Sequence, residues 1–331
     1  MKKIMLSAVA LMIGAIGFAQ TNSSTVYQEG DGFISEVQQI GQLNTAIQGQ
    51  FDTWTPDSND FARIDQRGLG NYATQFQNDD HARVGSARIL QIGTSNAANQ
   101  SQVFFGNSTL SATQNGFFNV SNQFQTGGHG NTGIVYQGNL VWGNNARQEQ
   151  NGTNNYMNSQ ETGNYNVSDQ KQLGGSLHGI ANVRQSGSDN ASYQTQTGGA
   201  WNSVGELRAT QSGTANYAVQ DQVSLGEGNN GNYASIDQRG NYGTALQYQY
   251  GDGGFATILQ GSGTNNYGYQ LQVDGSDFGD AQLTQNGNYN WSQQYQYGSG
   301  NQSNVNQNGG SMWSIVTQHG VGNSNTVVQT N

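Results

Sequence analysis

The sequence contains no cysteine, a single proline and few charged residues. Without cysteine, the chain can form neither disulfides nor thiolate metal sites. Lysine and arginine number 11 against 21 aspartates and glutamates, and the resulting net charge of −10 disfavours binding to nucleic-acid phosphates. After the first twenty residues, no apolar run approaches the roughly 18 residues that a membrane-spanning helix needs.

Apolar residues are also scarce. They make up 33% of the 331 residues, where about 45–50% is usual for a globular domain. Glutamine, asparagine and 48 glycines take their place, so the composition resembles a low-complexity, prion-like tract. Composition alone would allow disorder, but the periodicity described below favours a folded repeat protein.

The amino terminus has the features of a secretory signal peptide. Lys2 and Lys3 precede an apolar stretch over residues 4–18, and small residues at Gly17 and Ala19 suit cleavage near Gln20. We predict a signal peptide over residues 1–19 and a repeat domain over residues 20–331; a first core helix is the alternative for the amino terminus. Removing the two lysines leaves 9 basic against 21 acidic residues, a net charge of −12. We therefore expect a secreted protein, a destination that the lack of cysteine suits.

A short motif repeats along the rest of the chain. A Gln-x-Gly triplet, as at Gln39 and Gln66, is usually followed by Asn five residues after the Gln and by another Gln eleven residues after it. Irregular copies at Gln137, Gln160 and Gln260 carry one or two inserted residues, which gives about twelve units. We predict that the recurring amides form structural ladders: Gln39, Asn44, Gln50, Gln66, Asn71, Gln77, Gln91, Asn96, Gln102, Gln114, Asn119, Gln125, Gln185, Asn190, Gln196, Gln211, Asn216, Gln222, Gln238, Gln249, Gln285, Asn290, Gln296, Gln307, Gln318 and Gln329, with Gln318 counted as the first Gln of a unit.

Each unit contains two segments of period two, which indicates two strands. The first reads small-x-aliphatic-x-Gln, as in residues 62–66, and the second Asn-x-small-x-Gln-x-Gln, as in residues 71–77. The glycine between them suits a turn with positive φ. Because one such unit cannot bury its thin apolar face alone, units must stack. We predict an all-β fold, a β-solenoid of about twelve strand–turn–strand repeats with two parallel sheets, in which inward amides pair about 4.7–4.8 Å apart.

The two ends of this solenoid carry the functional expectation. Repeat-like sequence begins at Ser24, directly after the predicted signal peptide, and continues to Gln329, with no recognisable capping repeat. Unpaired sheet edges invite another copy to add, and identical stacked repeats give an open, head-to-tail assembly. We therefore expect a homopolymer, a cross-β fibre.

The Gln-x-Gly-x-x-Asn-x-Ala-x-x-x-Gln unit resembles the curlin repeat of the major and minor curli subunits, which are secreted bacterial functional amyloids. Curlin repeats usually begin with Ser six residues before the first Gln, where this chain has Asp60, Gly85, Ser108, Asn232 or Gly254. The resemblance implies export through an outer-membrane secretion pore, polymerisation on a nucleator subunit, and extracellular fibres for biofilm matrix and adhesion. From the residues themselves we expect a structural protein rather than an enzyme, with no cofactor, because no carboxylate recurs beside the histidines.

Three alternatives stay open. The chain could be the minor, nucleating subunit, because both subunit types would carry the same ladder. It could be a monomeric solenoid such as an adhesin or ice-binding protein, which needs a regular outward array that the mixed outward positions lack. An enzyme on a β-helix would need a cluster of acidic or basic residues on one face, and none is visible.

Other motifs favour structure over chemistry. The acid–histidine cluster at residues 79–81 is interpreted as a solvated loop, and the two GxGxxG matches at residues 128–133 and 226–231 as turns. The histidines occupy unrelated repeat positions: His81, His129, His178 and His319.

Aromatic and charged residues alternate with the inward positions. We expect the aromatics to stack along exposed strands or, alternatively, to bind glycans, dyes or other fibrils: Tyr72, Phe76, Tyr217, Tyr248, Trp291 and Tyr295. We expect the charges to form a solvated face that could also slow premature association: Arg63, Asp65, Arg88, Asp169, Lys171 and Asp221.

Overall fold

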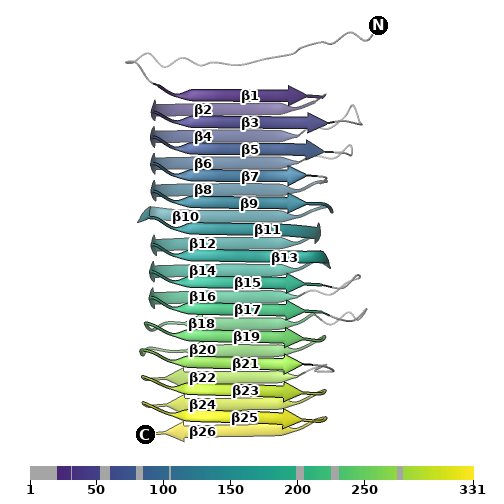
Figure 1. Cartoon of the computed structure of the whole chain (residues 1–331), viewed down its shortest axis with the longest axis vertical. Helices are drawn as coiled ribbons and strands as arrows, with labels where there is room; N and C mark the ends of the chain where they lie inside the picture. The colour runs from purple at the N-terminus through teal and green to yellow at the C-terminus, as the bar shows by residue number, and fades with distance from the viewer. Residues whose placement is uncertain are drawn as a thin grey trace.

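The computed structural model describes residues 21–30, 32–52, 60–79, 85–103, 106–198, 205–224, 231–273 and 279–331. The predicted signal peptide, His81 and most of the second GxGxxG match lie outside these residues. Within them the chain forms 26 strands and no helix. The strands alternate between two 13-stranded sheets, and in each sheet the strands stack along the long axis of a rod, with β1 at one end and β26 at the other (Figure 1).

Odd-numbered strands form one sheet, called here the odd sheet, and even-numbered strands form the other, the even sheet. The odd sheet contains β1 (Ser23–Glu29), β3 (Thr45–Asp52), β5 (Tyr72–Asp79), β7 (Ala97–Val103), β9 (Val120–Thr126), β11 (Asn145–Thr153), β13 (Val167–Leu177), β15 (Ala191–Thr197), β17 (Tyr217–Val223), β19 (Thr244–Tyr250), β21 (Tyr267–Val273), β23 (Trp291–Tyr297) and β25 (Trp313–His319). The even sheet contains β2 (Ile34–Gln42), β4 (Phe61–Leu69), β6 (Ser86–Thr94), β8 (Thr109–Phe117), β10 (Thr132–Trp142), β12 (Tyr156–Asn164), β14 (Ile180–Ser188), β16 (Glu206–Thr214), β18 (Tyr233–Gln238), β20 (Phe255–Gln260), β22 (Asp280–Asn286), β24 (Gln302–Asn308) and β26 (Ser324–Thr330).

Each repeat is an even strand, a short turn and the next odd strand. The described chain thus holds twelve such repeats, from β2–β3 to β24–β25, with β1 and β26 as single strands at the ends. Every strand pairs in parallel with the strand two places along the chain, as β4 does with β2 and β6. The predicted fold class, an all-β solenoid of two parallel sheets, is confirmed.

The register stacks equivalent residues on one another. Between β4 and β6, Ile64 lies opposite Ile89 and Gln66 opposite Gln91. Inward and outward residues alternate, so that Ile64 and Ile89 are fully buried between the sheets. This in-register stacking is what converts a sequence repeat into continuous columns of like side chains.

The backbones of successive turns stack so closely that a Cβ atom does not fit at several of the turn glycines. Gly93 has a φ of +121°, and a Cβ built on it would lie 1.9 Å from the carbonyl oxygen of Gly116 in the next repeat. The residue before the ladder asparagine also has positive φ, but there Leu43, Ser95 and Phe118 are accommodated. A Cβ is therefore excluded at Gly93, whereas the second turn position accepts other residues; in the irregular turn of β10, Val141 lies opposite Gly116.

Candidate functional site

The first glutamine of each repeat faces the interior near the end of an even strand. The Gln66 amide donates one hydrogen bond to the carbonyl oxygen of Thr45 in the odd sheet, at 2.9 Å, and one to Gln91 Oε1, at 2.8 Å. This amide therefore joins the two sheets and also links successive repeats. The even-sheet ladder contains Gln39, Gln66, Gln91, Gln114, Gln137, Gln185, Gln211, Gln238, Gln260, Gln285, Gln307 and Gln329.

The second glutamine of each repeat forms an equivalent ladder in the odd sheet. Gln50 Nε2 donates to Gln77 Oε1 at 2.8 Å, and Gln77 Nε2 donates to Gln102 Oε1 at 2.8 Å. The odd-sheet ladder contains Gln28, Gln50, Gln77, Gln102, Gln125, Gln150, Gln172, Gln196, Gln222, Gln249, Gln272, Gln296 and Gln318.

A third glutamine ladder, in the middle of the odd sheet, was missing from the predicted set. Gln48 Nε2 donates to Gln75 Oε1 at 2.8 Å, and the column continues through every odd strand to Gln294 in β23. The sequence signal for it is the Gln-x-Gln pair at the end of the second strand. We call this column the central ladder.

The ladder asparagines stack at the turn between the two strands. Asn71 donates from its backbone N–H and from Nδ2 to Asn44 Oδ1, at 3.0 and 3.1 Å, and Nδ2 also donates to the Gly93 carbonyl oxygen at 3.0 Å. Asn96, Asn119, Asn190, Asn216 and Asn290 accept or donate in the same column. The hydrogen bonds between ladder asparagines run toward the amino-terminal end of the rod, whereas those between ladder glutamines run toward the carboxyl-terminal end.

Of the three irregular copies, Gln137 and Gln260 lie in the even-sheet ladder, but the position predicted for Gln160 is wrong. In β12 it is Glu161 that lies opposite Gln137 and Gln185, while Gln160 lies opposite Tyr136 and Arg184 on the outward face. Glu161 is followed by Gly163 and Asn166 at the regular offsets, so this repeat contains a Gln-to-Glu replacement and no insertion.

The assignment of Gln318 to the first strand of a unit is also corrected. Gln318 lies in β25 and accepts from Gln296 at 3.0 Å in the odd-sheet ladder. Gln329 lies in β26 and accepts from Gln307 at 2.8 Å in the even-sheet ladder. Even and odd strands both end on an inward glutamine, and eleven residues separate Gln307 from Gln318 as well as Gln318 from Gln329. The spacing therefore does not show which type of strand contains Gln318.

Glu161 interrupts the even-sheet ladder with a buried carboxyl group. Gln137 Nε2 donates to Glu161 Oε2 at 2.9 Å, and Ser159 Oγ lies 3.4 Å from Oε1. On the other side, Gln185 Oε1 is buried with no hydrogen-bond partner among the described residues. Burial raises the pKa of Glu161 to about 7, because water no longer solvates the charged form. A protonated Glu161 carries an O–H that can satisfy the Gln185 oxygen.

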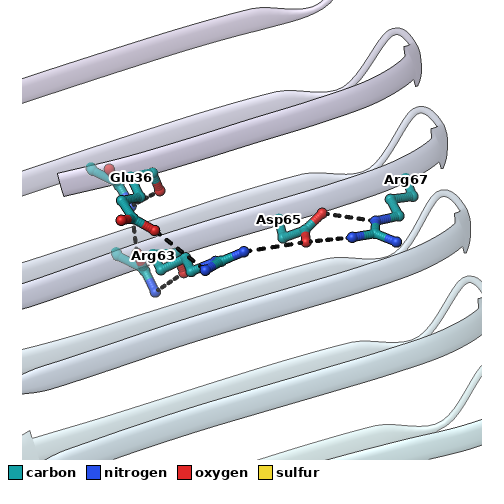
Figure 2. Close-up of polar contacts among 6 residues, drawn as sticks. Glu36, Arg63, Asp65 and Arg67 are labelled. Atoms are coloured by element: carbon teal, nitrogen blue, oxygen red, sulfur yellow. Dashed lines mark hydrogen bonds and ion pairs between the residues drawn. The ribbon is translucent and has the colours of Figure 1, made fainter. Parts of the chain in front are cut away.

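The outer faces carry the predicted charges, with one exception to the expected solvation. Asp65 is only 2% exposed, although it occupies an outward strand position. Figure 2 shows the reason: Arg67 donates to both Asp65 carboxylate oxygens, at 3.1 and 3.0 Å, and Arg63 lies between Asp65 and Glu36. The arginine side chains cover the carboxylate and satisfy it.

Outward aromatic residues stack from strand to strand. Tyr267, Trp291 and Trp313 form one such column, with ring centroids 5.9 and 5.4 Å apart. Tyr248 and Tyr295 both contact Tyr269 in a second column. Tyr72, Phe76 and Tyr217 are exposed. The strand-to-strand spacing of the rod fixes the geometry of these columns.

Features that could indicate catalysis are dispersed over the described chain. Gly128 and Gly130 have positive φ in the turn before β10, and no helix follows them. His129, His178 and His319 lie in three separate turns or strands, and no group of three or more histidine, aspartate or glutamate side chains is placed to hold a metal ion among the residues described.

The two ends of the rod differ from its middle. The odd sheet ends at β1 and β25 and the even sheet at β2 and β26, and no described strand pairs with their outer edges. All residues of β1 are exposed, whereas in β8 every second residue is buried. Gln28 and Gln39 begin the ladders at one end, and Gln318 and Gln329 end them at the other.

No protein-family model matches the chain, and a search of curated proteins finds no significant relative. The described part of the chain contains no helix long and apolar enough to span a membrane.

Proposed function

We propose that this protein is a secreted structural subunit that self-assembles end to end into extracellular, curli-like amyloid fibres. The observation that carries the proposal is the pair of open ends. At each end both sheets stop at an edge whose outer backbone groups pair with no described strand. A second copy that adds in parallel satisfies these groups and continues the ladders.

The interior favours this role because its stability comes from stacking. Buried amides are costly when unpaired, by about 1–3 kcal/mol each, and each added repeat pairs those of the repeat before it. Gln50, for example, accepts from Gln28 and donates to Gln77. The same stacking that propagates within one chain can continue from one chain to the next.

The sequence resemblance to curlin repeats gives the biological setting of the proposal. It supports secretion through an outer-membrane pore, growth from a nucleator subunit, and a role of the fibres in biofilm matrix and adhesion. The predicted signal peptide over residues 1–19 is consistent with the export step.

The test uses residues 20–331, purified under denaturing conditions and diluted into buffer. We expect thioflavin-T fluorescence to rise after a lag and fibres to give reflections near 4.7 and 10 Å. A species that stays monomeric in sedimentation while showing strong β circular dichroism would contradict the proposal and favour a monomeric binding solenoid.

A further inference from the structure

The central ladder ends in valine at both ends of the rod. From β3 to β23 the column contains only glutamine, but Val26 of β1 lies opposite Gln48 and Val316 of β25 lies opposite Gln294. Val26 is 46% exposed, whereas Val316 is 2% exposed. A column that is otherwise uniform thus changes its chemistry only in the two terminal odd strands.

The other two glutamine ladders do not end in this way. Gln28 and Gln39 are the first members of their ladders among the described residues, and no amide of that part of the chain donates to their Oε1 atoms. At the opposite end, Gln318 Nε2 donates to the Gln302 carbonyl oxygen at 2.8 Å, and Gln329 Nε2 donates to that of Trp313 at 2.9 Å. Each of these amides keeps a second N–H for the next glutamine.

The two ends therefore complement each other in polarity and in pattern. The carboxyl-terminal end offers amide donors and the amino-terminal end offers amide acceptors. Along the strand, the inward residues of β1 follow the same order as those of β25: Ser24, Val26 and Gln28 against Ser314, Val316 and Gln318. Two ends that merely terminated the rod would have no need to match.

We propose that β1 of a second copy of this chain adds to β25, and its β2 to β26, in the one register that places Val26 on Val316. This joint rests on the proposed function and specifies its contact. Extending the register of neighbouring strands then stacks Ser24 on Ser314, Gln28 on Gln318, Val37 on Val327 and Gln39 on Gln329.

The valine pair sets the register of the joint. A slip of two residues keeps inward residues inward but places Val26 on Gln318 or Ser314. The first slip leaves the outer N–H of Gln318 buried without an acceptor, and both slips break the valine contact. If both positions were glutamine, the contact between two copies would be the same as the contact between any two neighbouring odd strands within one chain.

Substitution of the valines tests the joint by a double-mutant cycle, read as the rate of elongation on preformed seeds of the same variant. Val26→Gln and Val316→Gln each place a glutamine against a valine at every joint, and we expect each to slow elongation about tenfold through one unpaired amide. The double variant V26Q/V316Q restores a continuous glutamine column, so its rate should return toward the unsubstituted rate. Thr25→Gln, an outward substitution in the same strand, is the matched control and should change the rate little.

Crosslinking tests the register directly, since the chain has no cysteine of its own. Thr25→Cys with Ile315→Cys places two outward thiols side by side across the proposed joint, and the shortest bis-methanethiosulfonate linker should then give a ladder of covalent oligomers. Thr25→Cys with Thr326→Cys is the control, because it reports β1 added to β26 instead.

The outcomes separate the two proposals. Fibres in which the control pair crosslinks, or in which the losses of V26Q and V316Q simply add in the double variant, would overturn the joint and leave end-to-end assembly standing. Failure of the unsubstituted chain to form fibres would instead overturn the proposed function.

Discussion

Gln137 donates its amide to Glu161 across 2.9 Å, and this contact is where the even-sheet ladder changes from amide to carboxyl group. Elsewhere in the described ladder a glutamine follows each glutamine and passes one N–H onward. An ionised Glu161 has no proton to pass on, which leaves Gln185 Oε1 without a donor. The side chains around the carboxyl group are uncharged: Gln137 of β10, Ser159 of β12, Ser168 of β13 and Gln185 of β14.

The stability of the rod should depend on pH through Glu161. Because its pKa is raised from 4.5 to about 7 on folding, the folded chain keeps a proton that the unfolded chain loses between these values. The contribution is fully present below about pH 4.5, falls as the pH rises, and levels off above about pH 7, a loss of about 3 kcal/mol.

The measurement is urea unfolding of freshly diluted monomer at several pH values, compared with Glu161→Gln. This variant restores the ladder amide, so its stability advantage over the unsubstituted chain should grow from pH 4.5 to pH 7. An advantage that stays constant over this range would show that the carboxyl group does not titrate there.

The buried amides of the central ladder should contribute more to the free energy of unfolding than the outward side chains beside them. Gln100→Ala removes the acceptor of Gln75 and the donor of Gln123, and it frees the Arg88 carbonyl oxygen. We expect a loss of about 3 kcal/mol in the free energy of unfolding. Ser101→Ala, its outward neighbour, should change it by less than about 0.5 kcal/mol. Equal effects would mean that the buried amides do not stabilise the rod.

The terminal glutamines should matter for growth. Gln318→Ala with Gln329→Ala removes both amide donors at the carboxyl-terminal end, so polymerisation followed by thioflavin-T should slow. Substitution of the outward Thr74 or Asp237 should slow it less. Equal rates for the two sets would contradict a role of the ladders in assembly.

The turn glycines should divide into two classes. Gly93→Ala places a Cβ 1.9 Å from the Gly116 carbonyl oxygen, which the stacked backbone cannot relieve without opening the turn. We expect a loss of at least about 3 kcal/mol or failure to fold. Gly70→Ala is the matched control: its nearest contact is Ser95 Oγ at 3.6 Å, and its φ of +64° should cost only about 1 kcal/mol. Thermal unfolding of the two variants makes the comparison.

Much of this architecture could be predicted from the sequence because the repeat encodes it locally. Alternation with period two specifies strands and their inward faces, and fixed offsets between Gln and Asn specify which side chains stack. For these reasons the two parallel sheets and about twelve repeats followed from the residues alone.

The tertiary structure decided what depends on register. In the sequence, Gln160 and Glu161 are both candidates for the ladder position if the length of the following turn varies between repeats. The pairing of β12 with β10 and β14 places Glu161 opposite Gln137 and Gln185 and so decides between them. A repeat motif determines which residues face inward, whereas the ladder partner of each inward side chain is set by the neighbouring strand, which lies more than twenty residues away in the sequence.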